Sequence, residues 1–248
     1  MQTLDGRLLY SATDLSRFLA CEHLTRLDRR AALGGPRPPY FDDPGLAVVQ
    51  ERGREHEGRY LASLTADGGR RVVDLRDWFG GERSVERYTR HAAATLEAMR
   101  AGADVIYQGA FFDGTWLGYP DFLLRVERPG GLGAWSYEVA DTKLSREAKA
   151  GALLQVLLYA DLLATLQGAE PEQVHLVLGG PEPRPVAFRV RHYAAYFRSV
   201  RERFLAFTSS TRDLPRAVDP VPHCDLCDWQ TVCEAERREV DHLSFVAG

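Results

Sequence analysis

The chain of 248 residues is 45% hydrophobic and 27% charged, as in ordinary globular proteins, and its net charge of −4 argues against non-specific coating of nucleic acid. Four cysteines are too few for a disulfide scaffold, and no N-terminal targeting signal is visible, so we expect a cytoplasmic protein. The longest apolar stretch, Gly151 to Leu166, contains polar residues and is too short to span a bilayer, which argues against a membrane protein.

Helical patterns occupy most of the first hundred residues. The spacing of apolar residues predicts one helix over residues 11–33, with Ser11 or Thr13 as its N-cap. Two further helices are predicted over Leu46 to Leu64 and over Glu82 to Arg100, because apolar and charged residues separate there at helical spacing.

After residue 104 the apolar residues recur with a period of two, which is typical of strands. Two such runs, Val105 to Phe112 and Thr115 to Leu117, flank Asp113-Gly114, and this arrangement predicts a tight hairpin. The second strand is predicted to continue through Phe122 to Val126. A third antiparallel strand is predicted over Trp135 to Thr142.

The last predicted elements alternate between helix and strand. A long helix from about Arg146 to Gln167 precedes a buried strand over Val174 to Leu178, an edge strand over Val186 to Val190 and a helix over Tyr193 to Phe207. This order predicts an α/β fold, with a mixed sheet flanked by helices in a single domain. We divide that domain into an N-terminal helix and loop, a core, and a C-terminal cysteine segment, at residues 1–45, 46–210 and 211–248.

The third strand ends in Asp141-Thr142-Lys143, which suggests a site for a divalent cation. Residues i and i+2 of a strand share a face, so Asp141 and Lys143 project together while Thr142 faces away. Asp121 lies in the neighbouring strand and is expected near Asp141. Two carboxylates at one spot repel unless a hard cation such as Mg²⁺ or Mn²⁺ lies between them. Taken alone, the motif is more typical of a surface ion pair.

Three other polar side chains are candidates for the same site. His56 lies on the helix before the strands and offers an imidazole ligand, although a solvated surface histidine is the commoner case. Gln155 and Tyr159 are four residues apart on the helix after the third strand, so they share one face. They are suited to contacting a nucleic-acid backbone or orienting Lys143, and a plain helix edge is the alternative.

The four cysteines are distributed unevenly. Cys21 stands alone, whereas Cys224-x2-Cys227-x5-Cys233 is a tight triplet near the other end of the chain. If all four bind one metal centre, the two ends of the chain must meet. Four thiolates suit either a structural Zn²⁺ ion or a cubane cluster, and the chemistry alone slightly favours zinc because zinc sites are commoner.

Together these motifs resemble the RecB-like nucleases of the PD-(D/E)XK superfamily, in the iron–sulfur branch that includes AddB-type nuclease domains and CRISPR-associated exonucleases. The resemblance covers nearly the whole chain. The Gly-x-x-His element of these nucleases corresponds to residues 53–56, and their Gly-x-x-Asp element corresponds to residues 118–121. The (D/E)-x-K element is residues 141–143, and Gln-x-x-x-Tyr is residues 155–159.

The resemblance implies a role for each matching residue. His56, Asp121 and Asp141 would hold Mg²⁺ or Mn²⁺, with the main-chain carbonyl of Thr142 as a further ligand, and Lys143 would be the catalytic lysine. Asp121 and Asp141, together with Gln155 and Tyr159, would complete the catalytic set. Cys21, Cys224, Cys227 and Cys233 would hold a structural [4Fe–4S] cluster that clasps the two ends of the chain, with Zn²⁺ as the alternative.

The function implied by this resemblance is DNA hydrolysis by in-line attack of metal-activated water, with exonuclease action expected on single strands or duplex ends. DNA is the expected partner, together with a helicase or another subunit of a nuclease complex, in DNA repair, recombination or defence. The alternative is a non-catalytic module that binds DNA or supports assembly within a helicase–nuclease complex.

Overall fold

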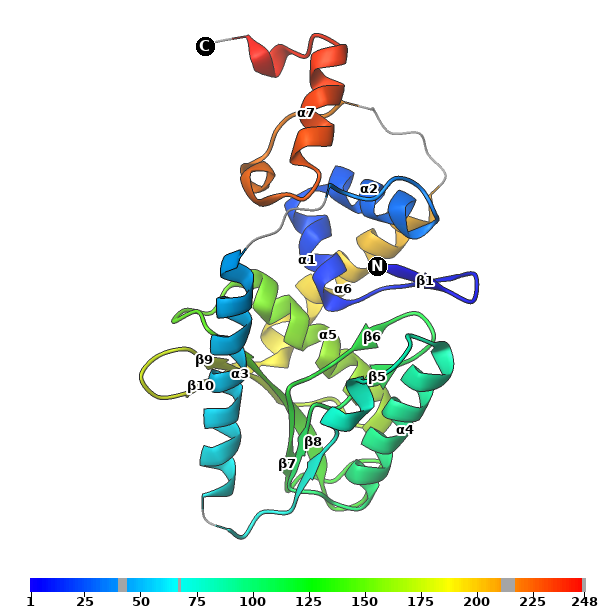
Figure 1. The fold of residues 1–248 in the computed structure, drawn as a ribbon. Coiled ribbons are helices and arrows are strands. Elements are labelled where there is room, and N and C mark those ends of the chain that lie inside the picture. Colours follow the sequence, from blue (N-terminus) through cyan, green and yellow to red (C-terminus); the bar gives the residue numbers. More distant parts are fainter. Residues whose placement is uncertain (40–43, 67, 211–216, 247–248) are drawn as a thin grey trace.

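A mixed six-stranded sheet with helices on both faces forms the centre of the molecule (Figure 1). The computed structural model describes residues 1–39, 44–66, 68–210 and 217–246. The domain boundary expected at residue 211 therefore falls on a stretch outside the described residues, and the proposed division of the domain stays a prediction.

Strands and helices alternate through most of the chain. The strands are β1 (Gln2–Leu4), β2 (Arg7–Leu9), β3 (Val72–Asp74), β4 (Val105–Tyr107), β5 (Phe111–Phe112), β6 (Leu117–Gly118), β7 (Phe122–Val126), β8 (Ser136–Lys143), β9 (Gln173–Leu178) and β10 (Arg184–Arg189). The α-helices are α1 (Ala12–Ala20), α2 (Glu22–Ala32), α3 (Pro44–Thr65), α4 (Val85–Arg100), α5 (Ala150–Gln167), α6 (Val190–Ser209) and α7 (Gln230–Glu239). Three short 3₁₀ segments are η1 (Arg76–Phe79), η2 (Pro222–Leu226) and η3 (Leu243–Phe245).

The sheet has the order β10-β9-β8-β7-β4-β3. Its antiparallel pairs are β10–β9, β8–β7 and β7–β4, whereas β8–β9 and β4–β3 are parallel. The helix between the members of each parallel pair, α5 or α4, provides the crossover that parallel strands require. The predicted mixed α/β sheet is confirmed, and the strand predicted at the sheet edge is β10.

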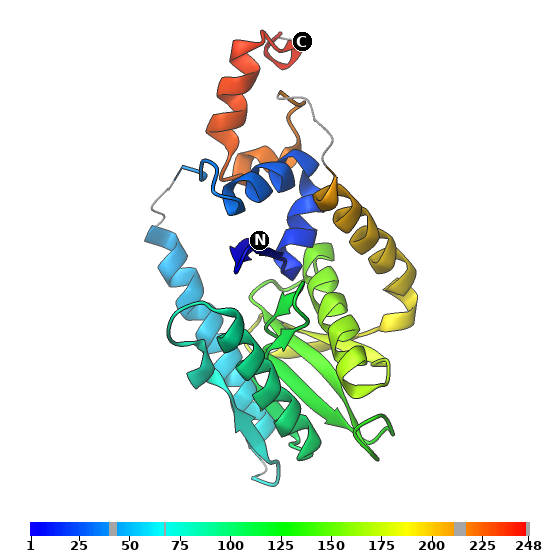
Figure 2. The same cartoon turned by 90° about the vertical axis from the view of Figure 1, so that its right-hand side faces the viewer.

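Alternate residues of the strands face two different hydrophobic cores. Tyr60 of α3 packs with Val105, Phe122 and Val177 on one face. On the other face α1, α4, α5 and α6 cover a larger core that includes Val139 of β8 (Figures 1 and 2). Because side chains alternate along a strand, the end of β8 presents Asp141 towards the α5 face and Thr142 towards α3.

The helix predicted over residues 11–33 is two helices. Ser11 is the N-cap of α1, and its backbone N–H donates to the Asp14 carboxylate in a capping box. The helix stops at Cys21, whose backbone is extended (φ −166°, ψ 115°), and α2 starts again at the next residue. No glycine or proline marks this break, so the sequence pattern did not reveal it.

The strand predicted over Val105 to Phe112 is interrupted in the structure. Gln108 has a left-handed backbone (φ 57°), which is unusual for a residue other than glycine. Residues before it pair with β7 in the main sheet, and residues after it form the small β5–β6 hairpin around Asp113-Gly114. The hairpin prediction is confirmed, but both continuous strands are wrong, because the predicted second strand is likewise divided into β6 in the small sheet and β7 in the main sheet.

The two ends of the chain meet, as joint binding of all four cysteines would require. Trp229, just before α7, is 2% exposed and packs with Leu24 and Leu27 of α2. Figure 1 shows α7 beside α2, remote from the sheet.

Helix α5 is long and apolar enough for a membrane span, although we expected this stretch to be too short. Half of its residues are buried in the fold. It is apolar around its circumference because it packs between the sheet and the helices α1 and α6, as a core helix does. It ends at Gly168, whose left-handed backbone (φ 61°) is a common helix stop.

Candidate active site

Two aspartates meet where β7 begins and β8 ends. Phe122 pairs with Ala140 in the antiparallel register, so the next pair along this ladder is Asp121 with Asp141. Asp141 is 1% exposed and forms an ion pair with Lys143, whose side chain is partly exposed. The shared orientation predicted for Asp141 and Lys143 is thus present in the structure.

Asp121 is bound to the backbone of the neighbouring strand. Its Oδ2 accepts hydrogen bonds from the backbone N–H and the hydroxyl of Thr142, each at 2.7 Å. These bonds use one oxygen of Asp121 and fix the carboxylate beside Asp141. The Thr142 hydroxyl therefore positions Asp121, a role that the sequence pattern did not indicate.

The proximity of these carboxylates is electrostatically unfavourable. Burial, together with the charge of Asp121, raises the pKa of Asp141 to about 7, and the Lys143 ammonium only partly opposes the shift. Perturbed carboxyl groups of this kind are concentrated at functional sites, although ion-pair networks also produce them. The arrangement is suited to a positive charge placed between the two aspartates.

Sequence reasoning missed two residues of this site. Gln108, at the break after β4, donates from Nε2 to the Glu57 carboxylate and, at 3.4 Å, to Oδ1 of Asp121. Burial, and then the charge of Asp121, raises the pKa of Glu57. Glu57 follows His56 directly and was detectable as a further acid on that helix. Gln108 was not detectable, because only its left-handed backbone turns its amide between the two carboxylates.

His56 is buried rather than solvated. Its side chain extends from α3 to β9, where Nε2 lies 3.0 Å from the carbonyl oxygen of Val177. A carbonyl can only accept, so Nε2 carries a proton, and Nδ1 has no hydrogen-bond partner among the described residues. Val177 is the register partner of Thr142, which places the imidazole near the end of β8. Metal-binding histidines commonly donate their second nitrogen to a backbone carbonyl in this way.

Gln155 and Tyr159 interact with each other on the same face of α5. Gln155 Nε2 donates to the Tyr159 hydroxyl at 3.0 Å. Burial and the charge of Asp141 raise the pKa of Tyr159. Tyr159 is only 5% exposed, so Gln155 is the member of the pair that is more accessible to a ligand. A Cβ on Gly118 would lie 2.8 Å from the Tyr159 ring, which explains glycine at that position.

The donor atoms suit a hard divalent cation. His56 Nδ1 and Asp141 Oδ2 are buried and accept no hydrogen bond from the described residues, apart from the ion pair of Asp141 with Lys143. Nitrogen and carboxylate oxygen are ligands that Mn²⁺ accepts, and Mg²⁺ favours the oxygens. Among the described residues, however, no three His, Cys, Asp or Glu side chains form a group that could hold a metal ion. Joint coordination by His56, Asp121, Asp141 and the Thr142 carbonyl therefore stays a prediction.

The four cysteines border one cavity between α2 and the C-terminal segment. Burial raises the pKa of Cys227, and it raises the pKa of Cys233 to about 11. Thiols packed together in this way need a cation if they are to ionise. Within the described ranges the cysteines do not form a metal-holding group either, so a cluster shared by Cys21, Cys224, Cys227 and Cys233 stays a prediction.

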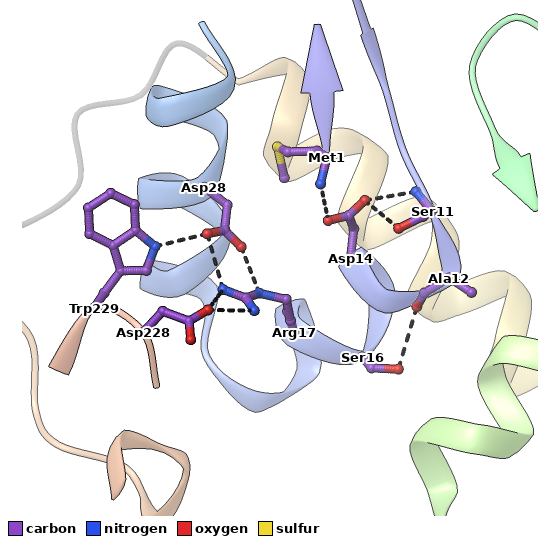
Figure 3. A network of polar contacts seen from close by, with 9 residues as sticks. All are labelled: Met1, Ser11, Ala12, Asp14, Ser16, Arg17, Asp28, Asp228 and Trp229. Carbon is purple, nitrogen blue, oxygen red and sulfur yellow. Dashed lines mark hydrogen bonds and ion pairs between the residues drawn. The ribbon is translucent and has the colours of Figure 1, made fainter. Parts of the chain in front are cut away.

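A polar network joins the same two segments without any metal (Figure 3). Arg17 of α1 donates to both oxygens of Asp28, at 2.8 and 3.2 Å, and to Asp228 at 3.1 Å. The indole Nε1 of Trp229 donates to Asp28 at 2.9 Å. These bonds hold the C-terminal segment on α1 and α2 beside the cysteines.

One comparison with known proteins, that with protein families, agrees with this geometry. The sequence model of the PD-(D/E)XK nuclease superfamily matches residues 10–234, which include the whole six-stranded sheet and the carboxylate site. No curated protein matches the chain. Among solved structures, the crystal structure of SSO0001 is similar over 76% of this chain and 96% of its own, with 13% identity and a TM-score of 0.33. A similarity this weak supports no further conclusion.

Proposed function

Because the chain belongs to the PD-(D/E)XK nuclease superfamily, we propose that it is a metal-dependent deoxyribonuclease acting at Asp121, Asp141 and Lys143. The superfamily consists generally of nucleases that use divalent metals. The observation that carries the proposal is the pairing of Asp121 with Asp141 across β7 and β8, with the Lys143 ammonium beside them. Two carboxylates can hold a cation that assists phosphodiester hydrolysis, and a lysine beside them can stabilise charge on the phosphate.

Asp121 and Asp141 would hold Mg²⁺ or Mn²⁺, with the free Nδ1 of His56 and the Thr142 carbonyl as further ligands. The cation would supply Lewis acidity towards the phosphodiester. Oδ1 of Asp121 is the more available oxygen for the cation, because Oδ2 already accepts two hydrogen bonds from Thr142 whereas Oδ1 accepts only a 3.4 Å bond from Gln108. The buried charge of Asp141 favours such a cation electrostatically.

The remaining side chains act on the substrate. Lys143 is partly exposed, so its ammonium can donate to a phosphate oxygen on which charge develops during hydrolysis. We expect Gln155, which donates a hydrogen bond to the Tyr159 hydroxyl, to orient Lys143 or a backbone phosphate. Gln108 acts indirectly, because its amide nitrogen donates to both Glu57 and Asp121 and thereby bridges the two carboxylates.

The finer assignments rest on the resemblance to RecB-like nucleases. We propose exonuclease action on single strands or duplex ends, in DNA repair, recombination or defence, and in the cytoplasm. A helicase or another subunit of a nuclease complex is the proposed protein partner. A non-catalytic role in such a complex is disfavoured because Asp141 and Lys143 are both present and paired.

We also propose that the four cysteines hold a structural [4Fe–4S] cluster, with Zn²⁺ as the alternative. Support comes from their common cavity and from the contact between the two ends of the chain. Iron and sulfide analysis with the visible absorption spectrum distinguishes the two metals.

Digestion of end-labelled single- and double-stranded DNA with and without Mn²⁺ tests the proposed activity. We expect Mn²⁺-dependent cleavage by the wild type and its loss in Asp141→Ala and Lys143→Ala. Matched controls are Asp219→Ala, which changes an exposed aspartate, and Lys149→Ala, which changes the only other lysine of the chain. Cleavage by Asp141→Ala or Lys143→Ala at the wild-type rate rejects the assignment.

A further inference from the structure

A hollow of about 610 Å³ lies where the N-terminal hairpin faces η1 and the start of α4. Figure 2 shows the N-terminus in the middle of the molecule, between the helices α1 and α2 and the sheet. We call this hollow the hairpin cavity; Phe79, Arg83, Arg87, Tyr119 and Asp14 are among its lining residues. Its volume is within the range of pockets that bind small organic ligands.

We infer that the hairpin cavity binds nucleotides of a single DNA strand whose backbone continues to the carboxylate site. The inference rests on the proposed nuclease function and adds to it a location and a chemistry for strand recognition. Three features carry it: accessible aromatic rings, a guanidinium group without a partner among the described residues, and a direct structural connection to Asp121.

The aromatic rings offer a surface on which a base can stack. Phe79 is 39% exposed although it is a large apolar side chain, and its ring centroid lies 4.9 Å from that of Tyr119. His91 contacts both rings, at 5.2 and 5.8 Å. A supported aromatic ring with a free face is the usual platform for unpaired bases, because every base has a π-face.

The charges around the cavity favour an anion. Arg83 lines the cavity and forms no hydrogen bond or ion pair with any other residue in the described part of the chain. Asp14, an acid in the same wall, already forms an ion pair with the N-terminal ammonium of Met1. Its carboxylate also accepts two hydrogen bonds from Ser11 (Figure 3). A free guanidinium beside a satisfied carboxylate suits a phosphate group.

A second hollow of similar volume continues the path away from the sheet. It shares Arg83 and Asp14 with the hairpin cavity and adds Arg37, which also has no hydrogen bond or ion pair with the described residues. Its other acid, Asp28, is engaged by Arg17 (Figure 3). Arg83 and Arg37 therefore offer two guanidinium groups along two adjoining hollows.

The cavity also connects to the carboxylates. Tyr119 precedes Asp121 by two residues, which is about 7 Å along an extended chain. His91, which packs against Phe79 and Tyr119, donates from Nε2 to the carbonyl of Gln108 at 3.0 Å, and the Gln108 amide contacts Asp121. From a base stacked on Phe79, the sugar–phosphate backbone can continue towards the start of β7, next to Asp121.

Arg87 supports this arrangement without being the phosphate ligand. Its guanidinium donates to the backbone carbonyls of Phe79, Gly80 and Gly81, at 3.4, 3.1 and 2.8 Å. These three bonds fix the loop that presents the Phe79 ring. Arg87 is therefore a positioning residue, whereas the Arg83 guanidinium is available to the strand.

Fluorescence anisotropy with a labelled oligothymidylate single strand tests the inference. All proteins carry Asp141→Asn so that no cleavage occurs. We expect Phe79→Ala to weaken binding by about 5- to 150-fold, as loss of one stacked base does, and Phe79→Trp to retain it. Arg83→Ala should lower the slope of log affinity against log salt by about 0.7, the value for one phosphate contact on a single strand.

Two controls match these variants in chemistry but lie elsewhere. Tyr196→Ala removes an aromatic ring of α6 that is 57% exposed, and Arg100→Ala removes an exposed arginine at the far end of α4. Affinity and salt slope should be unchanged in both. Thermal melting of every variant checks that the fold is retained.

The outcomes for strand binding and for cleavage are distinguishable. If the wild type cleaves DNA while Phe79→Ala and Arg83→Ala bind like the controls, the cavity assignment is wrong and the nuclease assignment stands. If the strand binds with the expected losses but Mn²⁺-dependent cleavage is absent, the strand site stands and the catalytic assignment fails. A protein that neither binds nor cleaves DNA overturns both.

Discussion

Asp141 shows how a single residue can be unfavourable for stability and required for the proposed function. Its carboxylate is buried near Asp121 and Glu57, and only Lys143 opposes these charges among the groups that act on its pKa. Ionisation of such a group is unfavourable in the folded protein unless a cation is nearby. The same buried charge is a strong attractant for a divalent ion.

The raised pKa of Asp141 predicts a pH-dependent effect of Asp141→Asn on stability in EDTA. The folded-state pKa is above the usual 3.8, so the wild type loses stability, relative to the variant, as pH rises from about 4 through about 7. At pH 8 the variant should be the more stable by up to about 4 kcal/mol, and the difference should shrink towards pH 4. Urea unfolding at pH 4, 6 and 8 measures it, and a difference independent of pH contradicts it.

Gly118 illustrates a steric requirement at the residue scale. A Cβ there would lie 2.8 Å from the Tyr159 ring, so Gly118→Ala should displace Tyr159 and cost on the order of 1–3 kcal/mol. The control is Gly58→Ala on α3, where a Cβ meets nothing within 4 Å and alanine should stabilise the helix by about 0.5–1 kcal/mol. The denaturant concentrations at the unfolding midpoints of the two variants measure these effects. Equal destabilisation by both changes would rule out the steric explanation.

At the scale of elements, the break between β4 and β5 creates the site. A continuous β4–β5 strand would have paired with one long partner and left no irregular backbone beside Asp121. The left-handed Gln108 ends the pairing, and its amide then lies between Glu57 and Asp121. Strained residues of this type commonly occur at functional sites. They persist only where the surrounding structure holds them in place.

The attachment of the C-terminal segment through one tryptophan is a prediction at the same scale. Trp229 is buried against α2 and donates to Asp28, so Trp229→Ala should release residues 217–246 while the sheet stays folded. Loss of a buried tryptophan typically costs about 3–5 kcal/mol. Hydrogen exchange should rise in α7 and α2 but not in β8.

Trp78→Ala, which changes a partly buried tryptophan of η1, is the control for general destabilisation. Unchanged exchange in α7 would show that other contacts suffice.

In the whole molecule, the ends of the chain are joined by a polar connection and by one proposed to involve a metal, in addition to the apolar packing of Trp229 on α2. The polar connection is formed by Arg17, Asp28, Asp228 and Trp229. The candidates for the metal-based connection are the four cysteines. Because loops of about 200 residues cost much conformational entropy to close, a crosslink there is expected to stabilise the protein appreciably.

Cys21→Ala tests whether a metal centre held by the four cysteines joins the two ends of the chain. We expect the variant to lose iron or zinc, to melt at a lower temperature and to be cleaved by protease near residue 217, while the β7–β8 core is retained. Metal analysis, thermal melting and limited proteolysis measure these effects. Cys21→Ala with wild-type metal content and melting temperature would exclude Cys21 from the centre.

The chain order of helices and strands was determined by local sequence. The Ser11 cap, the Asp113-Gly114 turn and the Gly168 helix stop act over a few residues, so their patterns predict structure without knowledge of the rest of the chain. The alternation that turns Asp141 and Lys143 to one face is equally local, because it follows from strand geometry alone. The short strands β1, β2 and β3 escaped prediction, since three residues carry almost no periodic signal.

Only the tertiary structure decided which distant groups meet. The register of β7 on β8 brings Asp121 to Asp141, and the packing of α3 buries His56 and brings Glu57 to Gln108. The place of Arg83 in the cavity wall likewise follows from contacts between segments far apart in sequence. Such contacts depend on how all the elements pack together, and the free energy of that packing is not contained in any short stretch of residues.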